Sequence, residues 1–492
     1  MKIVWGVNAQ CRNATLTAYS EDRNTIVFAG RAEHYSRIKN DSNLNIALVN
    51  AALQYGAPTK IIWNSYSTLT RLNQVIRKRA VELAPRAYMK QFLPSAILKK
   101  ISFKSFGRHY IKAAGGFFTS GFKSACIIVV DDVPYGETIS IWMAHDDSLY
   151  RVYSKSYPDS LGLFYRRMAL QITGRQFELN HLMNLAAYGK PNYKSIMLTE
   201  MFDGNTDIDF ELNRDLKNDH YIWRPELKSD IQRFNIAATT QDILEEVLHG
   251  IISHAKIITG SENLVYVGSM AMNSVANASI ASAGLFNKIW IPPTTNDSSI
   301  GGILAYAKHQ YKLKTVSLGQ HIPSTSTNDD IIAELKQTGI ACVARGRTEF
   351  SPFSLGNRSI FVDPMSYNGK EILNEIKGRR KNAVYSCIIL EENFADYFII
   401  PPGITSPHRQ YTVACRYQDR YSAICRVDGY SHVQTINRVD APELYELLKM
   451  WEDQSGIPML LNTSLNLKTG TLVNTKDDII DFERQHNIKV LT

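Results

Sequence analysis

A chain of 492 residues with 44% hydrophobic and 21% charged residues is long enough for two or more domains and has an ordinary globular composition. The N-terminus has too short an apolar run for a signal peptide, and no run of about 18 apolar residues could cross a membrane, so we expect a cytoplasmic protein without a membrane partner. The six cysteines include no CxxC pair, which argues against a zinc site, and the net charge of +8 gives weak support for a nucleic-acid partner.

The N-terminal segments predict two strands around a tight turn, followed by a third strand and a helix. Residues 2–7 form an apolar run suited to a buried strand, and residues 16–19 and 26–29 predict the next two strands. Residues 43–56 carry apolar side chains at helical spacing and end at glycine, which predicts a helix with a C-terminal cap.

Later segments repeat the alternation of strand, turn and helix. Residues 125–131 predict a buried strand that ends on an acidic residue, and residues 139–155 predict a pair of strands. Residues 240–258 predict an amphipathic helix, and residues 263–277 predict a strand, a turn and a helix from about residue 272. Residues 200–235 lack a clear period, which indicates an inserted surface element.

A polar triplet, Asn357-Arg358-Ser359, lies in the segment EFSPFSLGNRSIFVDP, residues 349–364, and a related segment, LNTSLN, spans residues 461–466. A guanidinium fork, an amide and a hydroxyl within three residues could hold a small planar anion such as a carbamoyl or acyl phosphate. The alternative is an ordinary loop in which the arginine pairs with Asp363.

Six segments resemble the O-carbamoyltransferases that modify antibiotics and nodulation factors. GNRSIFVDP and LLNTSLN resemble the two signature segments of the family's C-terminal half. Further matches in the family's order are YPDSLGLFY (157–165), LMNLAAYGKPNY (182–193), NLVYVGSMAMNSVAN (263–277) and RVDGYSHVQTI (426–436). The resemblance implies an α/β protein with a duplicated actin-like ATPase domain at residues 1–320, a linker at residues 321–345, and an α+β carbamoyl-adenylate-forming domain at residues 346–492.

The resemblance also implies a reaction and two sets of binding residues. Carbamoyl phosphate and ATP give carbamoyl adenylate in the C-terminal domain, and a hydroxyl acceptor then takes the carbamoyl group in the actin-like domain. The expected donor-binding residues are Asn357, Arg358, Ser359, Lys377, Arg380, Asn462 and Ser464. The expected nucleotide-binding residues are Arg108, Lys112, Asp131, Gly136, Gly268, Ser269 and Asn273.

The chain departs from the family at the positions expected to bind a metal ion. The family's HHxxHAASAFYxSPF segment holds two histidines four residues apart, and Arg108 and Lys112 stand in their places. The family's third ligand, an aspartate, aligns with Thr295, or with Asp297 if two residues are deleted. We therefore predict no metal at this site. Two readings are open: the site has decayed, or the two cations replace the charge of the ion.

The catalytic residues are equally altered. Arg12 stands where the family has a histidine thought to assist the acceptor hydroxyl, and arginine stays protonated, so it is a poor base. Glu33 and His109 are the other candidates, although His109 is expected to point away from Arg108 and Lys112 on the helix.

Departures in the C-terminal half concern positive charges. SPFSLGNRS has Phe353 where the family has arginine, RRKNAVYSC leaves Arg379 and Arg380 as substitutes for a lost arginine, and RVDGYSHVQ exchanges histidine and arginine at Arg426 and His432. Two functions follow: an O-carbamoyltransferase with an altered or metal-independent site, or an inactive homologue that serves an active carbamoyltransferase as an accessory subunit. The expected partners are a hydroxyl acceptor and a second copy or a paralogous active subunit.

Overall fold

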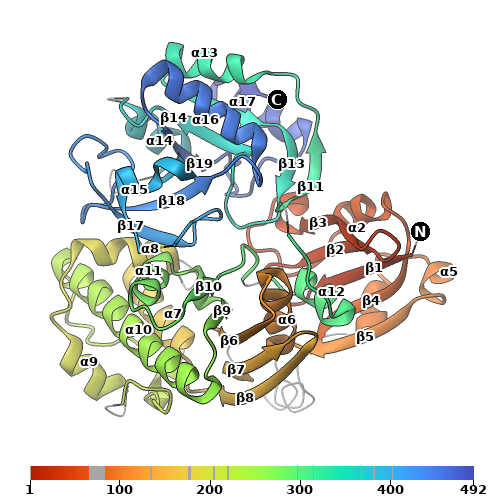
Figure 1. The fold of residues 1–492 in the computed structure, drawn as a ribbon, viewed down its shortest axis with the longest axis vertical. Coiled ribbons are helices and arrows are strands. Elements are labelled where there is room, and N and C mark those ends of the chain that lie inside the picture. Colours follow the sequence, from red (N-terminus) through yellow and green to blue (C-terminus); the bar gives the residue numbers. More distant parts are fainter. Residues whose placement is uncertain are drawn as a thin grey trace.

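The computed structural model describes residues 2–65, 84–132, 136–175, 179–202, 205–218, 221–295, 297–313, 315–366, 368–379, 383–401 and 403–492. The chain forms three bodies around a common junction (Figure 1). Two of them are the halves of the N-terminal domain, and the third is the C-terminal domain. Among the described residues, we find no helix with the length and apolar character needed to span a membrane.

The first half is built on a five-stranded sheet in which β1 is central. Strand β1 pairs antiparallel with β2 and parallel with β4, β2 pairs antiparallel with β3, and β4 pairs parallel with β5. The strands are, in sheet order, β3 (Thr25–Arg31), β2 (Thr15–Ser20), β1 (Ile3–Asn8), β4 (Pro58–Ser65) and β5 (Ser102–Gly107). The helices of this half are α1 (Glu33–Ser36), α2 (Ile46–Leu53), α4 (Pro85–Met89) and α5 (Ser95–Leu98).

The second half repeats this topology. Strand β6 is central, with β7 antiparallel on one side and β9 parallel on the other. The sheet order is β8 (Ser148–Ser156), β7 (Glu137–His145), β6 (Ser124–Val130), β9 (Asn263–Val267) and β10 (Lys288–Trp290). The same strand order and directions in both halves confirm the expected duplicated actin-like domain.

Two helices pack between the sheets and hold the halves together. Helices α6 (Arg108–Ser120) and α12 (Ser299–Ala307) share one buried cluster with residues of both sheets. Their backbones cross closely, because a β-carbon at Gly301 would lie 2.4 Å from the Ile111 carbonyl oxygen. The spacing of the two sheets therefore depends on glycine at this crossing.

A helical layer covers the outer face of the second sheet. It consists of α7 (Leu161–Thr173), α8 (Leu179–Leu185), α9 (Lys194–Met201), α10 (Asp230–Thr259) and α11 (Ser274–Ser282). Helix α10 begins ten residues before the expected start, because Ser229 and Gln232 form a capping box. The segment expected at the surface, residues 200–235, instead buries Phe202, Phe210 and Trp223 in the core.

The C-terminal domain is an eight-stranded mixed sheet with helices on both faces. Its order is β16 (Phe398–Ile399), β17 (Tyr411–Cys415), β18 (Tyr430–Ile436), β15 (Ser386–Leu390), β19 (Met459–Ser464), β14 (Arg358–Val362), β12 (Ile340–Ala344) and β20 (Val490–Leu491). Helices α13 (Asn328–Thr338) and α16 (Pro442–Ser455) pack on one face. Helices α14 (Gly369–Lys377) and α17 (Lys476–His486) contribute to the cluster on the other face, and α15 (Phe394–Tyr397) lies near β16.

The segment between the domains is more ordered than a linker. Strand β11 (Ser317–Ile322) pairs with β13 (Gly346–Glu349) in a separate two-stranded sheet. Residues 321–345, expected as the linker, contain α13 and β12, and β12 pairs with β14 and β20. The C-terminal domain therefore begins at about Asn328.

Candidate functional site

The turns that follow β6 and β9 are fastened together at the cleft between the two halves. The Ser269 amide donates to Asp131 Oδ1 at 2.9 Å, and the Asp132 amide donates to Ser269 Oγ at 2.8 Å. Gly268 has a φ of 107°, and a β-carbon there would lie 2.2 Å from the Val130 carbonyl oxygen. Asp131, Gly268 and Ser269, which were predicted to bind the nucleotide, therefore lie in direct contact and hold the two turns together. Gly136 also adopts a positive φ, of 83°, after residues 133–135, which lie outside the described residues.

Lys112, which stands at one of the two positions where the family has histidine, forms a buried ion pair. Lys112 Nζ lies 2.6 Å from both carboxylate oxygens of Asp131, and each side chain is 1% exposed. Burial raises the pKa of Asp131, but the charges of Lys112, His109 and Arg108 outweigh it, so this pKa lies below its ordinary value. The ammonium group of Lys112 is thus neutralised inside the protein.

His109 lies at the same carboxylate as Lys112. Its Nε2 is 3.6 Å from Asp131 Oδ2 and its Nδ1 is 2.7 Å from Ser140 Oγ. The expectation that His109 points away from Lys112 is wrong, because residues three apart share a helix face. Burial lowers the pKa of His109 to about 4, so the ring is neutral at pH 7.

The turn after β1 brings positive charge to the same cleft. Burial lowers the pKa of the Arg12 guanidinium, and the charges that act on it are those of Asp132, Arg31, Glu33 and Arg166. These charges come from both halves of the domain. Arg12 therefore lies where the two halves meet.

Glu33 is held by several donors. Its carboxylate accepts hydrogen bonds from Arg31 Nε and the Asn40 amide, both at 2.9 Å, and lies 3.3 Å from Lys39 Nζ. Burial raises the pKa of Glu33, but Arg31, Lys39 and the Asn40 amide lower it by more, so the pKa lies well below its ordinary value. A carboxylate with this pKa is a weak proton acceptor, so the geometry favours a structural role for Glu33.

Asp297 and Asn273 also have structural partners. Asp297 accepts from Thr15 Oγ1 at 2.6 Å and from the Ser299 amide at 2.8 Å, which fixes the start of α12. Asn273 caps α11 through the Ala276 amide and donates to Gln241. Within the described part of the chain, no group of three or more His, Cys, Asp or Glu side chains could hold a metal ion. The absence of a metal stays a prediction.

In the C-terminal domain, Glu349 shapes the loop before the triplet. One carboxylate oxygen, Oε1, accepts from the amides of Leu355, Asn357 and Arg358 at 2.8, 2.7 and 3.2 Å. Glu349 is 1% exposed, so the loop closes on a buried negative charge. This role could not be predicted from the sequence, because the donors lie six to nine residues after the acceptor.

The three residues of the triplet have different environments. Arg358 is fully buried and its guanidinium donates to five backbone carbonyls, those of Gln320, Arg345, Gly346, Asn357 and Val473. Asn357 donates to the Arg347 carbonyl and to Ser317. These contacts give Arg358 and Asn357 a structural role. Arg358 does not form the ion pair with Asp363 that was the alternative.

Four buried side chains at one end of the sheet have polar atoms without hydrogen-bond partners among the described residues. The register places Ser359, Asn462 and Gln434 on the same face. Asn462 is paired with Phe361, which lies two residues from Ser359. Ser386 is paired with both Asn462 and His432, and His432 lies two residues from Gln434, so all three side chains share a face. The unpartnered atoms are Ser354 Oγ, Ser359 Oγ, Gln434 Oε1 and both side-chain polar atoms of Asn462. Gln434 and Ser354 were not predicted; only the register and the loop bring them here.

The remaining predicted donor residues lie beside this group. Lys377 Nζ donates to the Ser464 carbonyl and to Asn466 Oδ1, and burial holds the pKa of Lys377 well below its usual value. Ser464 Oγ accepts from the Ser354 amide at 3.0 Å. Arg380 lies outside the described residues. We call Ser354, Ser359, Gln434 and Asn462 the polar end of the C-terminal sheet.

The exchanged residues Arg426 and His432 do not share a role. Arg426 pairs with Asp428 at 2.7 Å. His432 Nδ1 lies 2.7 Å from Thr412 Oγ1, and its Nε2 lies 3.0 Å from Asn184 Oδ1 of the other domain. His432 therefore connects the domains.

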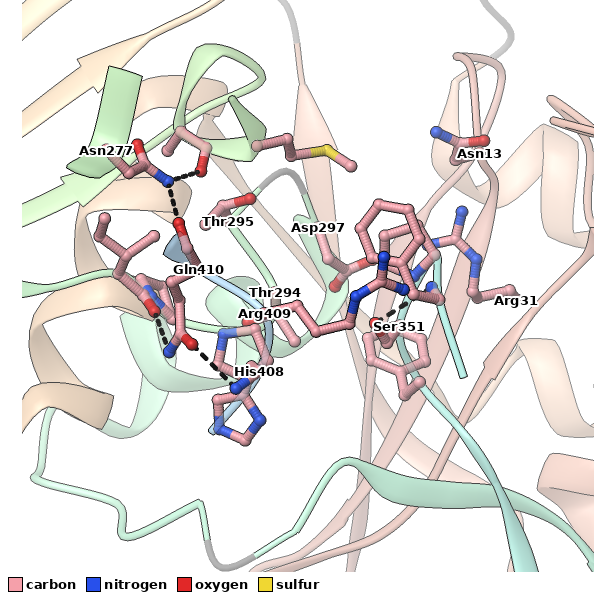
Figure 2. A pocket seen from close by; sticks show the side chains of 18 residues that line it. Asn13, Arg31, Asn277, Thr294, Thr295, Asp297, Ser351, His408, Arg409 and Gln410 are labelled. Carbon is pink, nitrogen blue, oxygen red and sulfur yellow. Dashed lines mark hydrogen bonds between the residues drawn. The ribbon is translucent and has the colours of Figure 1, made fainter. Parts of the chain in front are cut away.

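A pocket of about 720 Å³, including the part open to solvent, lies where the domains meet (Figure 2). Asn13, Arg31, Thr295 and Asp297 line it from the N-terminal domain. The loop residues Phe353, His408 and Arg409 line it from the C-terminal domain. The pocket thus joins the turn after β1 to the loop that precedes the triplet.

Comparison with known proteins finds one family model in each of the two domains. The model described as "Carbamoyltransferase N-terminus" matches residues 61–304, and "Carbamoyltransferase C-terminus" matches residues 332–492. Nodulation protein NolO of Bradyrhizobium diazoefficiens is 25% identical over 76% of this chain and 75% of its own length. An uncharacterized Synechocystis protein is 26% identical over 92% of this chain and 90% of its own.

Among solved structures, component A of (R)-2-hydroxyglutaryl-CoA dehydratase from Acidaminococcus fermentans aligns with a TM-score of 0.36 and 11% identity. The alignment covers 63% of this chain and 99% of that protein.

Proposed function

Because the chain belongs to the carbamoyltransferase family, we propose that it uses ATP to transfer a carbamoyl group from carbamoyl phosphate to a hydroxyl acceptor. The observation that carries this proposal is the polar end of the C-terminal sheet. Buried polar atoms without partners are costly, at roughly 1–3 kcal/mol each, so a cluster of them indicates a ligand. A carbamoyl group offers both donors and acceptors, and it matches the amide of Asn462 and the hydroxyl of Ser359.

The proposed reaction has three steps. Water converts carbamoyl phosphate to carbamate and phosphate, and a carbamate oxygen then attacks the α-phosphorus of ATP and displaces pyrophosphate. The acceptor oxygen finally attacks the carbonyl carbon of carbamoyl adenylate, loses its proton and releases AMP. The first two steps belong to the C-terminal domain and the last to the cleft of the actin-like domain.

The residues have complementary roles in this scheme. Ser359 and Asn462 orient the planar donor, and Lys377 holds the adjoining end of β19 through the Ser464 carbonyl and Asn466. At the cleft, Arg12 and Arg108 attract the phosphates of the nucleotide, whereas Lys112 is already neutralised by Asp131. In this scheme the neutral Lys112–Asp131 pair stands in place of a metal ligand, and we expect the transfer step to need no transition-metal ion.

The test is pyrophosphate release from ATP by the purified chain in the presence of carbamoyl phosphate. Asn462→Ala and Ser359→Ala are expected to lower the rate by about 100-fold or more, because each removes an orienting contact. The exposed Asn192→Ala is the matched control and is expected to retain the rate. A chain that releases no pyrophosphate with any candidate alcohol contradicts the proposal and favours the accessory-subunit function.

A further inference from the structure

The loop before β17 places a guanidinium in the pocket between the domains. Arg409 lies over the ring of Phe353, with its guanidinium carbon 4.5 Å from the ring centroid. Phe353 lies in the loop before the Asn357-Arg358-Ser359 triplet, at a position where the family pattern has arginine. The charge absent at position 353 is thus present at the same wall of the pocket, carried by a different loop.

Arg409 has few competing partners. Its Nε has no hydrogen-bond partner among the described residues, and no ion pair joins it to a carboxylate of those residues. Burial and the nearby charge of Arg379 lower its pKa to about 10, so it stays protonated at pH 7. The guanidinium is therefore charged and available to an anion.

The other charged groups of the pocket are engaged. Arg31 donates to Glu33 at 2.9 Å, and Asp297 accepts from Thr15 and Ser299. Burial lowers the pKa of His408 to about 4, which leaves that ring neutral at pH 7. Arg409 is thus the pocket's available charge within the described part of the chain.

The backbone around Arg409 is fixed to the N-terminal domain. Gln410 donates to the Ile291 carbonyl at 3.3 Å, and Asn277 donates to the Gln410 carbonyl at 2.9 Å (Figure 2). Both contacts cross between the domains. The backbone next to Arg409 is therefore fixed, and the Phe353 ring supports the guanidinium, which together reduce the entropy lost on binding.

We propose that Arg409 binds a phosphate group of the carbamoyl donor in this pocket and takes over the role of the arginine that Phe353 has replaced. The inference rests on the proposed function. A planar guanidinium suits phosphate because it can donate two parallel hydrogen bonds, and the stacked Phe353 ring leaves its edge free for them. The pocket lies between the polar end of the C-terminal sheet and the turn carrying Arg12, which are the sites of the two proposed half-reactions.

Calorimetric titration with carbamoyl phosphate tests this role. Arg409→Ala is expected to weaken binding by at least about tenfold, since it removes charge-assisted hydrogen bonds. The matched control is Arg438→Ala, because Arg438 also lies over an aromatic ring, that of Tyr445 at 5.2 Å, but is 70% exposed and paired with Glu446. The control is expected to bind as the unsubstituted chain does.

A swapped variant separates binding from folding. Phe353→Arg combined with Arg409→Phe returns the guanidinium to the other loop and is expected to recover most of the affinity lost in Arg409→Ala. Equal affinity of Arg409→Ala and the unsubstituted chain overturns the inference and leaves the proposed function intact. No recovery in the swapped variant, with its thermal midpoint unchanged, assigns Arg409 a packing role and also overturns the inference. No carbamoyl phosphate binding by the unsubstituted chain contradicts the proposed function and the inference together.

Discussion

Replacing Lys112 by methionine leaves the carboxylate of Asp131 buried without its counter-charge. Both side chains are 1% exposed, so solvent cannot supply the missing charge. Breaking one partner of a buried ion pair costs about 3–5 kcal/mol. The Ser269 amide still donates to Asp131, which places the expected loss near the lower limit, at about 3 kcal/mol.

The assay is urea unfolding followed by circular dichroism, with two comparison variants. Lys112→Met with Asp131→Asn removes both charges and is expected to recover most of the loss. Lys194→Met breaks an exposed pair with Asp242 in the same domain and is expected to cost at most about 1 kcal/mol. A Lys112→Met variant no less stable than Lys194→Met, or a double variant no more stable than Lys112→Met, refutes the reasoning.

The pH dependence gives an independent check on the same pair. The lowered pKa of Asp131 means that its contribution to stability is present above the ordinary carboxyl pKa and is lost as pH falls through the folded value. In Lys112→Met the pKa of Asp131 rises with burial, so acid protonates it and removes the cost. The stability difference between the variant and the unsubstituted chain is expected to shrink as pH falls from 7 toward 5.

Three further substitutions test single contacts. Asn462→Leu is expected to keep or raise the thermal midpoint while pyrophosphate release falls, because it removes two unpartnered polar atoms; a lowered midpoint contradicts this. Glu349→Ala is expected to cost about 3 kcal/mol or more in urea unfolding, since three amides lose one acceptor; a loss under about 1 kcal/mol argues against its organising role. Gly268→Ala is expected to cost at least about 2 kcal/mol and to weaken ATP binding, because its β-carbon meets the Val130 carbonyl; unchanged ATP affinity separates this turn from the nucleotide.

The N-terminal strands could be predicted from the sequence because each is a short apolar run between turns, whereas the duplicated architecture was predicted from the family resemblance. The start of α10 could not, because it depends on the capping contacts of Ser229 and Gln232 within a segment of weak periodicity. The placement of α13 and β12 in the C-terminal sheet likewise required long-range pairing with β14 and β20.

Part of the site was predictable as a set of residues, but its contacts were not, and Ser354, Gln434 and Arg409 were missed altogether. Arg358 and Ser359 are neighbours in one motif, yet the first donates to backbone carbonyls and the second has an unpartnered hydroxyl. The pairing of Lys112 with Asp131 spans 19 residues, and the stacking of Arg409 on Phe353 spans two loops. The residue types indicated which ligands the site could bind, whereas the hydrogen-bond and ion-pair partners of each side chain depended on the fold.

The Lys112–Asp131 pair lies in the domain assigned the transfer step, so it is tested by AMP release with an alcohol acceptor and Mg²⁺ present, before and after phenanthroline removes transition-metal ions. We predict AMP release that requires ATP, carbamoyl phosphate and the acceptor and that is unchanged by phenanthroline or by an added divalent transition-metal ion. AMP release that is lost with phenanthroline and restored by such an ion contradicts the proposal that the Lys112–Asp131 pair takes the place of a metal ion.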